Sequence, residues 1–428
     1  MELAVRTGLT QLGGRLLEGL LAADAGHRGA AVDCGAGHQA RLVSYRGKAV
    51  DTVLGPVTVR RAWYHCAECG HGLAPRDAEL GVAGQAMSPG LRKMAARAAA
   101  AVPFAKAAAL VGELAGITLT GKRAGRSAEA GGAAAARVIE AQAGAIAARA
   151  LVPLPPPSPA PGKLYIAIDG TGVPVVAAET EGRDGKGDDG KARTREVKLC
   201  AVFTQTTADE DGYPVRDPGS SSYLATFAPA ADFGMLMAAE ARRRGAEHVR
   251  QLTILGDGAV WIWNLAGQHF PAATQIAGLY HAREHAHDLA ALATRLLRDS
   301  QPDWLTQRLE ELDAGNIPAL LAAGRGLKFA GSLARERDKQ LGYFEVNAHR
   351  MRYAHFRSLG LFAGSGVVEA GGKAVIGQRL KLSGMRWTIP GAASIATLRC
   401  QEASNRWEEI WQCPHNQAPG ADLTRQAS

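Results

Sequence analysis

Hydrophobic residues recur at helical spacing in the first thirty residues and then give way to an alternating pattern. The leucines predict an amphipathic helix over 1–30, with packing or self-association as its role. β-Branched and aromatic residues at 40–44 and 50–64 surround a turn at Gly55 and Pro56, and they predict a β-rich segment over 31–85. The chain is therefore expected to begin with a helix and a small sheet.

The next segment, 86–150, is alanine-rich and helical in pattern. A predicted helix at about 104–114, a turn at 115–117 and a second helix starting near 118–120 form a helix-turn-helix pattern, whose second helix enters the major groove of DNA. A plain helical hairpin fits the same spacing, but the local positive charge favours DNA binding. The residues expected to face phosphates or base edges are Lys122, Arg123 and Arg126.

Six prolines in twelve residues mark 151–162 as a stiff, extended linker. It is the clearest predicted domain boundary. Beyond it, apolar runs at 163–170, 173–178 and 197–205 predict an antiparallel meander of three strands. A helix over 229–244 and a further strand complete this pattern.

Two of the apolar runs lead to an aspartate. Asp169 and Gly170 end the first run, and Asp257 ends the fourth between two glycines that allow close approach of other groups. The order of strands and helices is that of an RNase H-like fold, in which carboxylates on the first strand and at the end of the fourth lie side by side. The third carboxylate of that fold belongs on a late helix, where Glu369 begins a helical pattern. Helical patterns over 283–350 predict an all-α insertion before it.

The β-rich segment is flanked by a Cys/His pattern that is typical of a tetrahedral zinc site. Thiolates and imidazoles on short turns suit Zn²⁺, and the CxxC half is the more specific signal. Cys34 and His38 are more loosely spaced than the CxxC pair, so His65 and His71 remain alternative ligands. Buried thiols that bind no metal remain the alternative to a zinc site. Six cysteines in 428 residues are too few for a disulfide scaffold. The expected ligands of a structural Zn²⁺ are Cys34, His38, Cys66 and Cys69.

The predicted fold class is therefore α/β: an RNase H-like catalytic core with an all-α insertion, preceded by a zinc-binding β segment and a helix-turn-helix-like helical domain. After the linker, the predicted parts are the first part of the core (163–282), the insertion (283–350), the last part of the core with Glu369 (351–400), and a C-terminal helix and tail (401–428).

The net charge of the chain indicates which classes of partner it can bind. A formal net charge of +8 and a pI near 9.3 favour an anionic partner such as DNA. Residues 1–162 hold 18 Lys/Arg and 11 Asp/Glu, a net of +7, although a GC-rich genome would also enrich arginine. No apolar stretch is long enough to span a membrane, and the N-terminus does not resemble a signal peptide. We therefore expect a cytoplasmic protein.

Three carboxylates are what two-metal phosphoryl chemistry requires. Asp169, Asp257 and Glu369 would bind two Mg²⁺ or Mn²⁺ ions, because hard oxygen ligands suit these ions. Basic residues after Glu369 suit a surface facing phosphates: Lys373, Arg379 and Lys381. A second group is an auxiliary active-site candidate, with a core role equally open: His281, Glu284 and His285.

Several motifs taken together resemble the ISKra family of bacterial insertion-sequence transposases: IAIDGTGVPV, TREVKLCAVFTQ, LGDGAVWIWNLA, YHAREH and GSGVVEAGGKAVIGQRLKLSGMRW. The resemblance covers most of the chain, including the CxxC knuckle and the helical segment that ends in AEAGG. It implies a DDE transposase with Asp169, Asp257 and Glu369 as catalytic residues. Gly372 departs from the family, where a cysteine is expected.

The same resemblance implies metal-dependent nicking at transposon ends and transfer of the freed 3′ ends into target DNA. The implied partners are double-stranded DNA, both ends and target, and further copies of the chain in a homo-oligomer on paired ends. Two other classes remain open. One is a catalytically inactive, sequence-specific DNA-binding protein derived from a transposon. The other is a carboxylate-pair hydrolase such as a glycosidase, which the basic N-terminal region does not favour.

Overall fold

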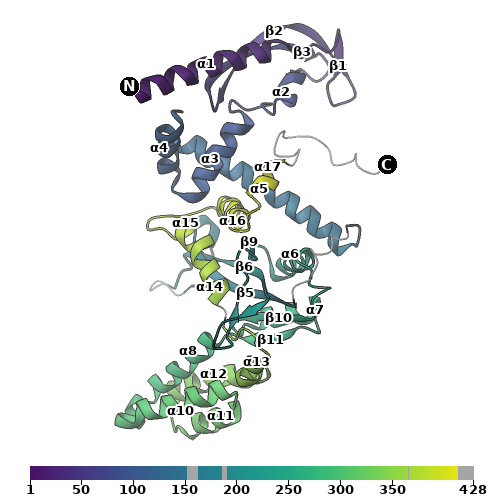
Figure 1. Cartoon of the computed structure of the whole chain (residues 1–428). Coiled ribbons are helices and arrows are strands. Elements are labelled where there is room, and N and C mark those ends of the chain that lie inside the picture. The colour runs from purple at the N-terminus through teal and green to yellow at the C-terminus, as the bar shows by residue number, and fades with distance from the viewer. Residues whose placement is uncertain (152–161, 186–189, 365, 413–428) are drawn as a thin grey trace. The chain divides into compact units, whose positions relative to one another are not determined.

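The computed structural model describes residues 1–151, 162–185, 190–364 and 366–412. The chain divides into two compact units (Figure 1). Among the described residues, the first contains 1–138, 390–402 and 406–412, and the second contains 139–389 and 403–405. Most of the linker predicted at 151–162, and the tail after Cys413, lie outside the described residues.

The first unit begins with α1 (Glu2–Ala22) and a four-stranded antiparallel sheet. Its strands follow one another in the sheet in sequence order: β1 (Ala31–Asp33), β2 (Gln39–Thr52), β3 (Gly55–Cys66) and β4 (His71–Leu73). The long β2–β3 hairpin turns at Gly55, where φ is +88°. The predicted helix and β-rich segment are both present.

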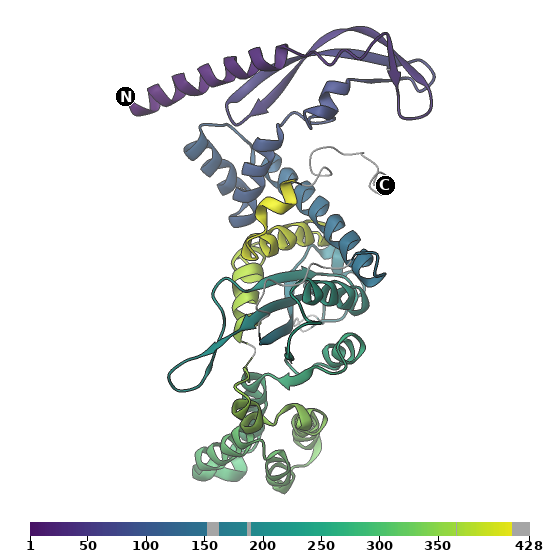
Figure 2. The same ribbon diagram turned by 45° about the vertical axis from the view of Figure 1, so that its right-hand side comes forward.

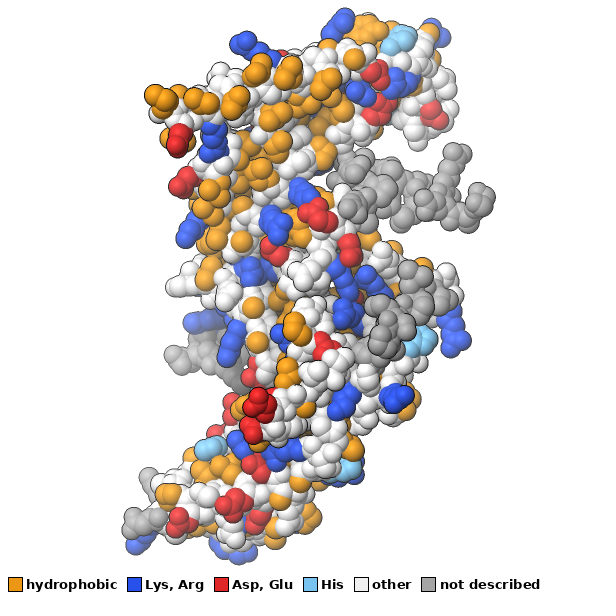
Figure 3. Space-filling view, viewed as in Figure 1, with side chains coloured by type: hydrophobic (Ala, Val, Ile, Leu, Met, Phe, Trp, Pro, Cys, Tyr) orange, Lys and Arg blue, Asp and Glu red, His pale blue; other side chains and the backbone are white. Residues whose placement is uncertain are grey.

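Helix α1 has apolar side chains on two faces. Leu17 and Leu21 pack against Val50, Val57 and Val59 of the hairpin. Figure 3 shows hydrophobic side chains gathered along the exposed part of this helix. The leucines that are more than half exposed are Leu3, Leu9, Leu12, Leu16 and Leu20.

The remaining elements of the first unit are helical: α2 (Pro75–Glu79), α3 (Pro89–Ala101), α4 (Phe104–Ala115), α5 (Gly121–Ala147), α16 (Ile389–Ala403) and α17 (Trp407–Gln412). The last turns of α5 belong to the second unit. Helix α4 matches its predicted span, and Gly116 ends it with a left-handed φ of +71°. Leu91, Val111 and Ile117 form a buried core between α3, α4 and the turn that follows.

The second unit is built on a five-stranded sheet in the order β11-β10-β5-β6-β9. Strands β5, β6 and β9 are antiparallel neighbours, and β10 and β11 run parallel to β5. The bounds are β5 (Lys163–Pro174), β6 (Thr194–Gln205), β9 (Ser222–Thr226), β10 (Gln251–Gly256) and β11 (Thr274–Ala277). A small hairpin of β7 (Thr207–Ala208) and β8 (Pro214–Val215) lies between β6 and β9 in sequence.

The predicted strand at 173–178 is wrong. Strand β5 continues through Asp169 and pairs with β6 as far as Pro174, and a 3₁₀-helix, η1 (Ala177–Thr180), follows it. The third antiparallel strand is β9, which the pattern did not predict. The strand end predicted at Asp169 and Gly170 is also wrong, because both residues pair with β6.

Helices cover this sheet. Helix α6 (Ala230–Arg243) packs against β6 and β9, whereas α14 (Gly366–Gly371) packs against β5 and β6. Figures 1 and 2 show α6 and α14 on opposite sides of the sheet. A π-helix, η4 (Gly372–Gly377), and α15 (Gln378–Leu380) continue from α14. Helix α7 (Val260–His269) follows β10.

The segment between β11 and α14 is helical, as predicted, and Figures 1 and 2 show its helices gathered at one end of this unit. Its core includes Leu289, Ala293, Leu327 and Leu341. Its elements are α8 (Leu279–Leu292), α9 (Thr294–Leu297), η2 (Arg298–Ser300), α10 (Gln301–Ala314), α11 (Ile317–Gly326), α12 (Gly331–Asn347), η3 (Ala348–Arg350) and α13 (Tyr353–Ser358). Among the described residues, no helix is long and apolar enough to cross a membrane.

Candidate active site and metal centre

Asp169 lies on the central strand β5, opposite Leu199 of β6. Its Oδ1 accepts a hydrogen bond of 2.7 Å from the backbone N–H of Gly170. Partial burial raises the pKa of this carboxyl, and the negative charges of Asp257 and Glu369 raise it further. The three predicted carboxylates are therefore close enough to interact electrostatically.

Asp257 directly follows β10. The parallel register places Leu255 beside Ala167, and the same register extended by two residues places Asp257 level with Asp169. Its Oδ1 accepts a hydrogen bond of 2.9 Å from the N–H of Ala259. Adjacent parallel strands thus present two carboxylates at the same level of the sheet.

The loop after Asp257 is held by the helical insertion. Gly258 has φ +103°, and a Cβ there would lie 2.5 Å from Cε2 of Tyr343 on α12. The hydroxyl of Tyr343 donates a hydrogen bond of 3.1 Å to the carbonyl of Asp257. Both the backbone conformation and the close approach require glycine at position 258. Tyr343 could not be predicted from the sequence, because a tyrosine within a helical pattern carries no signal of a contact with a distant loop.

Glu369 comes from α14, which packs against β5 and β6. The π-helix begins three residues later, at Gly372. A Cβ at Gly372 would lie 3.9 Å from Oδ2 of Asp169, so this helix face is directed at the catalytic candidate. Gly372, where the resemblance predicts a cysteine, therefore lies beside the carboxylates without replacing any of them.

His281 and His285 have different surroundings, although they are four residues apart on α8. The charge of His281 lowers the pKa of Asp169, and its Nδ1 lies 3.1 Å from Oε2 of Glu284. His285 instead stacks on Tyr343, with ring centroids 3.7 Å apart, and its Nδ1 lies 2.5 Å from Oε1 of Gln340. His281 belongs with the carboxylates, and His285 belongs to the contact between α8 and α12.

The three basic residues after Glu369 that were predicted to face phosphates differ in how exposed they are. Lys373 and Lys381 are exposed. Lys381 donates a hydrogen bond to Oγ1 of Thr171. Partial burial lowers the pKa of Lys381, and the Asp169 carboxylate opposes this shift in part. Arg379 is fully buried, with its guanidinium 4.9 Å from the centroid of Trp387. The prediction that Arg379 faces DNA is wrong, because its side chain packs against Trp387 and does not reach the surface.

The four predicted zinc ligands lie together in the first unit. Their ligand atoms all lie within 4.8 Å of one another, and the group could hold a zinc ion. The turn between β1 and β2 supplies one pair and the turn between β3 and β4 the other. Exposed His65 and His71 are outside the group, which leaves Cys34, His38, Cys66 and Cys69.

In the turn between β3 and β4, polar groups contact the cysteine sulfur atoms. The N–H of Cys69 donates to Sγ of Cys66 at 3.4 Å, and Sγ of Cys69 lies 3.2 Å from Nδ1 of His38. The hydrogen bond with Cys66, burial and the nearby Cys34 sulfur raise the pKa of Cys69 to about 12. Such crowding of thiols is relieved when a cation binds and stabilises the thiolates.

The predicted DNA-binding residues of α5 are not equivalent. Lys122 and Arg126 are exposed, whereas Arg123 forms an ion pair of 2.6 Å with Asp51 of β2. The N–H of Arg123 also donates to Oγ1 of Thr120, which caps the start of α5. Arg123 therefore joins α5 to the hairpin, and Lys122 and Arg126 remain accessible to a partner.

No protein-family model matches the sequence, and no curated protein is significantly similar to it. Two clusters of polar side chains are the candidate functional sites of this chain. One offers soft ligands in a closed group, and the other offers hard oxygen ligands around the edge of β5 and β10.

Proposed function

We propose that the chain is a DDE transposase of the ISKra type, which cuts DNA at transposon ends and joins the freed 3′ ends to target DNA. One arrangement carries this proposal: Asp169 lies on the central strand β5, Asp257 follows the adjacent β10 at the same level, and Glu369 lies on α14, which packs against β5. Three convergent carboxylates are the ligand set for two-metal phosphoryl transfer.

We also propose that the second unit is an RNase H-like core. Its strand order supports this, because three antiparallel strands are followed by two parallel strands on the other side of β5. The placement of the acids supports it as well, since one lies on the first strand and another follows the fourth. The helical insertion then separates these two acids from the third.

The residues present fit Mg²⁺ or Mn²⁺. Asp169, Asp257 and Glu369 would hold the ions, since their oxygens are hard ligands and their mutual repulsion is relieved by cations. Bound there, two ions would stabilise the attacking and leaving oxygens of the reaction as Lewis acids. Tyr343 and the N–H of Ala259 fix the Asp257 loop, and Lys381 places a positive charge beside Asp169.

The first unit supplies DNA binding in this proposal. Lys122 and Arg126 lie exposed on the second helix of the α4–α5 pair, where a major-groove helix would contact DNA. A structural Zn²⁺ would fix the two turns at one end of the hairpin. A homo-oligomer on paired ends is supported by the exposed leucines of α1, because an apolar helix face of this kind favours association.

The decisive experiment is cleavage of labelled end DNA by the full-length protein in Mg²⁺. Asp257→Asn, Asp169→Asn and Glu369→Gln should each lower the rate by about 10³-fold or more, in line with loss of one member of a catalytic unit. Asp232→Asn, at an exposed position on α6, is the matched control and should cleave normally. End DNA binding should persist in all four variants. Cleavage at the wild-type rate by the three carboxylate variants would falsify the proposal.

A further inference from the structure

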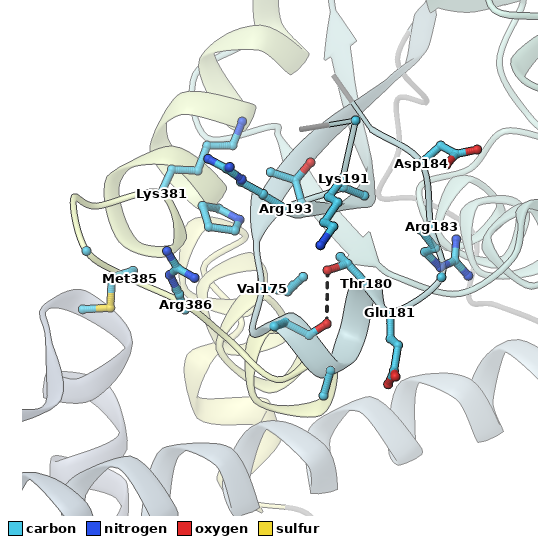
Figure 4. Close-up of a pocket in the computed structure, with 18 of the residues that line it drawn as sticks. Val175, Thr180, Glu181, Arg183, Asp184, Lys191, Arg193, Lys381, Met385 and Arg386 are labelled. Atoms are coloured by element: carbon cyan, nitrogen blue, oxygen red, sulfur yellow. Dashed lines mark hydrogen bonds between the residues drawn. The ribbon is translucent and has the colours of Figure 1, made fainter. Parts of the chain in front are cut away.

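A groove of about 1240 Å³ lies in the second unit, on the side of β5 where Lys381 meets Thr171. One wall is formed by residues within 174–184 and 190–194, and the other by the segment 381–386 that follows α15 (Figure 4). The part of the lining that carries charge consists of Glu181, Arg183, Asp184, Lys191, Arg193, Lys381 and Arg386.

Backbone hydrogen bonds hold the two walls together. The N–H of Val176 donates to the carbonyl of Trp387 at 2.9 Å, and the N–H of Trp387 donates to the carbonyl of Pro174 at 3.2 Å. The N–H of Ile389 donates to Oε1 of Glu179 at 2.9 Å. The guanidinium of buried Arg379 packs on the ring of Trp387. The groove is therefore a built feature of the fold, and Arg379 has a structural role in it.

Positive charge dominates the described lining, with five basic and two acidic side chains. Figure 4 shows Lys381, Arg193 and Arg386 gathered on one side of the groove, with Arg183 and Asp184 on the other. No aromatic side chain is among the described lining residues, so base stacking has no platform there. This chemistry suits phosphates and does not read bases.

The size and position of the groove favour a polymer over a small anion. Its volume exceeds the about 300–1,000 Å³ of ordinary small-molecule pockets. Lys381 lines the groove and donates a hydrogen bond to Oγ1 of Thr171, two residues after Asp169 on β5, so the groove begins beside the carboxylate cluster. A strand whose scissile phosphate lies at Asp169 would run directly into it.

We propose that this groove binds the phosphate backbone of the DNA strand that continues from the cleaved bond, without reading its sequence. The proposal rests on the proposed function for the identity of the cleaved bond. Binding of a phosphodiester strand in the groove can be tested without catalysis.

The first test compares two double variants of the full-length protein in EDTA. Arg183→Ala with Arg386→Ala removes two charges from the groove, and Lys328→Ala with Arg335→Ala removes two exposed charges of the insertion that do not line it. Affinity for random-sequence DNA is measured against salt concentration. The groove variant should lower the slope of log K against log salt by about 1.4 to 1.8, since each of the two lost phosphate contacts contributes about 0.7 to 0.9. Equal slopes in the two double variants would overturn the proposal.

The second test uses cleavage in Mg²⁺ on end DNA trimmed stepwise on either side of the scissile bond. The groove variant should cleave long DNA about tenfold more slowly than the control, and the difference should vanish once one side is trimmed to the scissile bond. A difference that survives trimming on both sides contradicts the proposal. If the wild-type protein cleaves no end DNA but the salt slopes still differ, the proposed function fails and the groove proposal stands. Displacement of random-sequence DNA by inorganic phosphate at micromolar concentration would show a small-anion pocket and overturn it.

Discussion

The two polar clusters differ in how far apart their residues lie in sequence and in how closely their ligands gather. The Cys/His group comes from two turns of one small sheet, and its ligand atoms lie within 4.8 Å of one another. The carboxylates come from β5, the loop after β10 and α14, with the whole helical insertion between the second and the third. In the part of the chain that the structure describes, the Cys/His group is the one set of three or more ligands gathered so closely.

This difference teaches which task each arrangement suits. A closed group of soft ligands satisfies one ion completely and so stabilises a local fold. Carboxylates that are spread more widely leave room for two ions about 3.5 to 4 Å apart and for substrate oxygens. The first cluster can form when a few turns fold, whereas the second requires the complete sheet and the late helix.

The strongest way to break this comparison is to remove a thiolate. Cys66→Ser should lose its zinc and expose the amides of the β2–β3 hairpin to hydrogen exchange, because structural Zn²⁺ contributes about 10–16 kcal/mol in small zinc-binding peptides. Exchange in the second unit should stay unchanged. Metal content is measured by mass spectrometry, with His71→Ala, an exposed neighbour outside the group, as the control. Zinc retained in Cys66→Ser and lost in His71→Ala would reverse the ligand assignment.

A smaller effect separates the two histidines of α8. His281→Ala should slow cleavage by about 10- to 100-fold with little change in Tm, the range typical when a group beside a metal ligand is lost. His285→Ala should instead lower Tm, because it removes the stacking on Tyr343 and the hydrogen bond with Gln340. Cleavage rates and melting curves of both variants distinguish a role at the reaction centre from a role in packing. The opposite pattern would place His285 at the reaction centre.

The smallest expected effect concerns the stability of the protein when no metal is bound at the three carboxylates. Asp169→Asn should raise Tm in EDTA at pH 7 by a few degrees, at about 2–4 °C for each kcal/mol. The folded state raises the pKa of Asp169 above its ordinary 3.8, so ionisation of this group opposes folding once the pH rises through that range.

The gain from Asp169→Asn should therefore disappear below pH 3.8, where the carboxyl is protonated in both states. Calorimetry at the two pH values measures it, and Asp232→Asn should show no gain at either. An unchanged or lower Tm for Asp169→Asn at pH 7 would mean that neither burial nor the neighbouring carboxylates penalise ionisation of Asp169 in the folded state.

The zinc ligands could be predicted from sequence because all four belong to local turns, and spacing along the chain then reflects distance in space. The carboxylates were found through the strands that carry them. Asp169 was nevertheless predicted at a strand end, and it lies within β5, because pairing with β6 continues beyond its glycines. Strand β9 was missed since five residues give too little alternation to detect.

Other features depend on contacts between distant segments, which no local pattern encodes. Tyr343 fixes the Asp257 loop from a helix in the insertion. Arg379 is charged, and its position after Glu369 favoured a surface role, yet it packs under Trp387. Arg123 likewise pairs with Asp51 on the hairpin. In each case the partner decides the role of the residue, and the partner lies far away in sequence.

The π-helix between Glu369 and Lys381 fixes the angle between a carboxylate and a cation that face the same aspartate. Each residue of an α-helix turns the chain by about 100°, and a π-turn accommodates one residue more than an α-turn. Loss of a single residue within 372–377 would restore regular α-helix and rotate one of these side chains away from Asp169. Point substitutions here can be mild while a one-residue deletion is not, so the length of this segment is under tighter constraint than its composition.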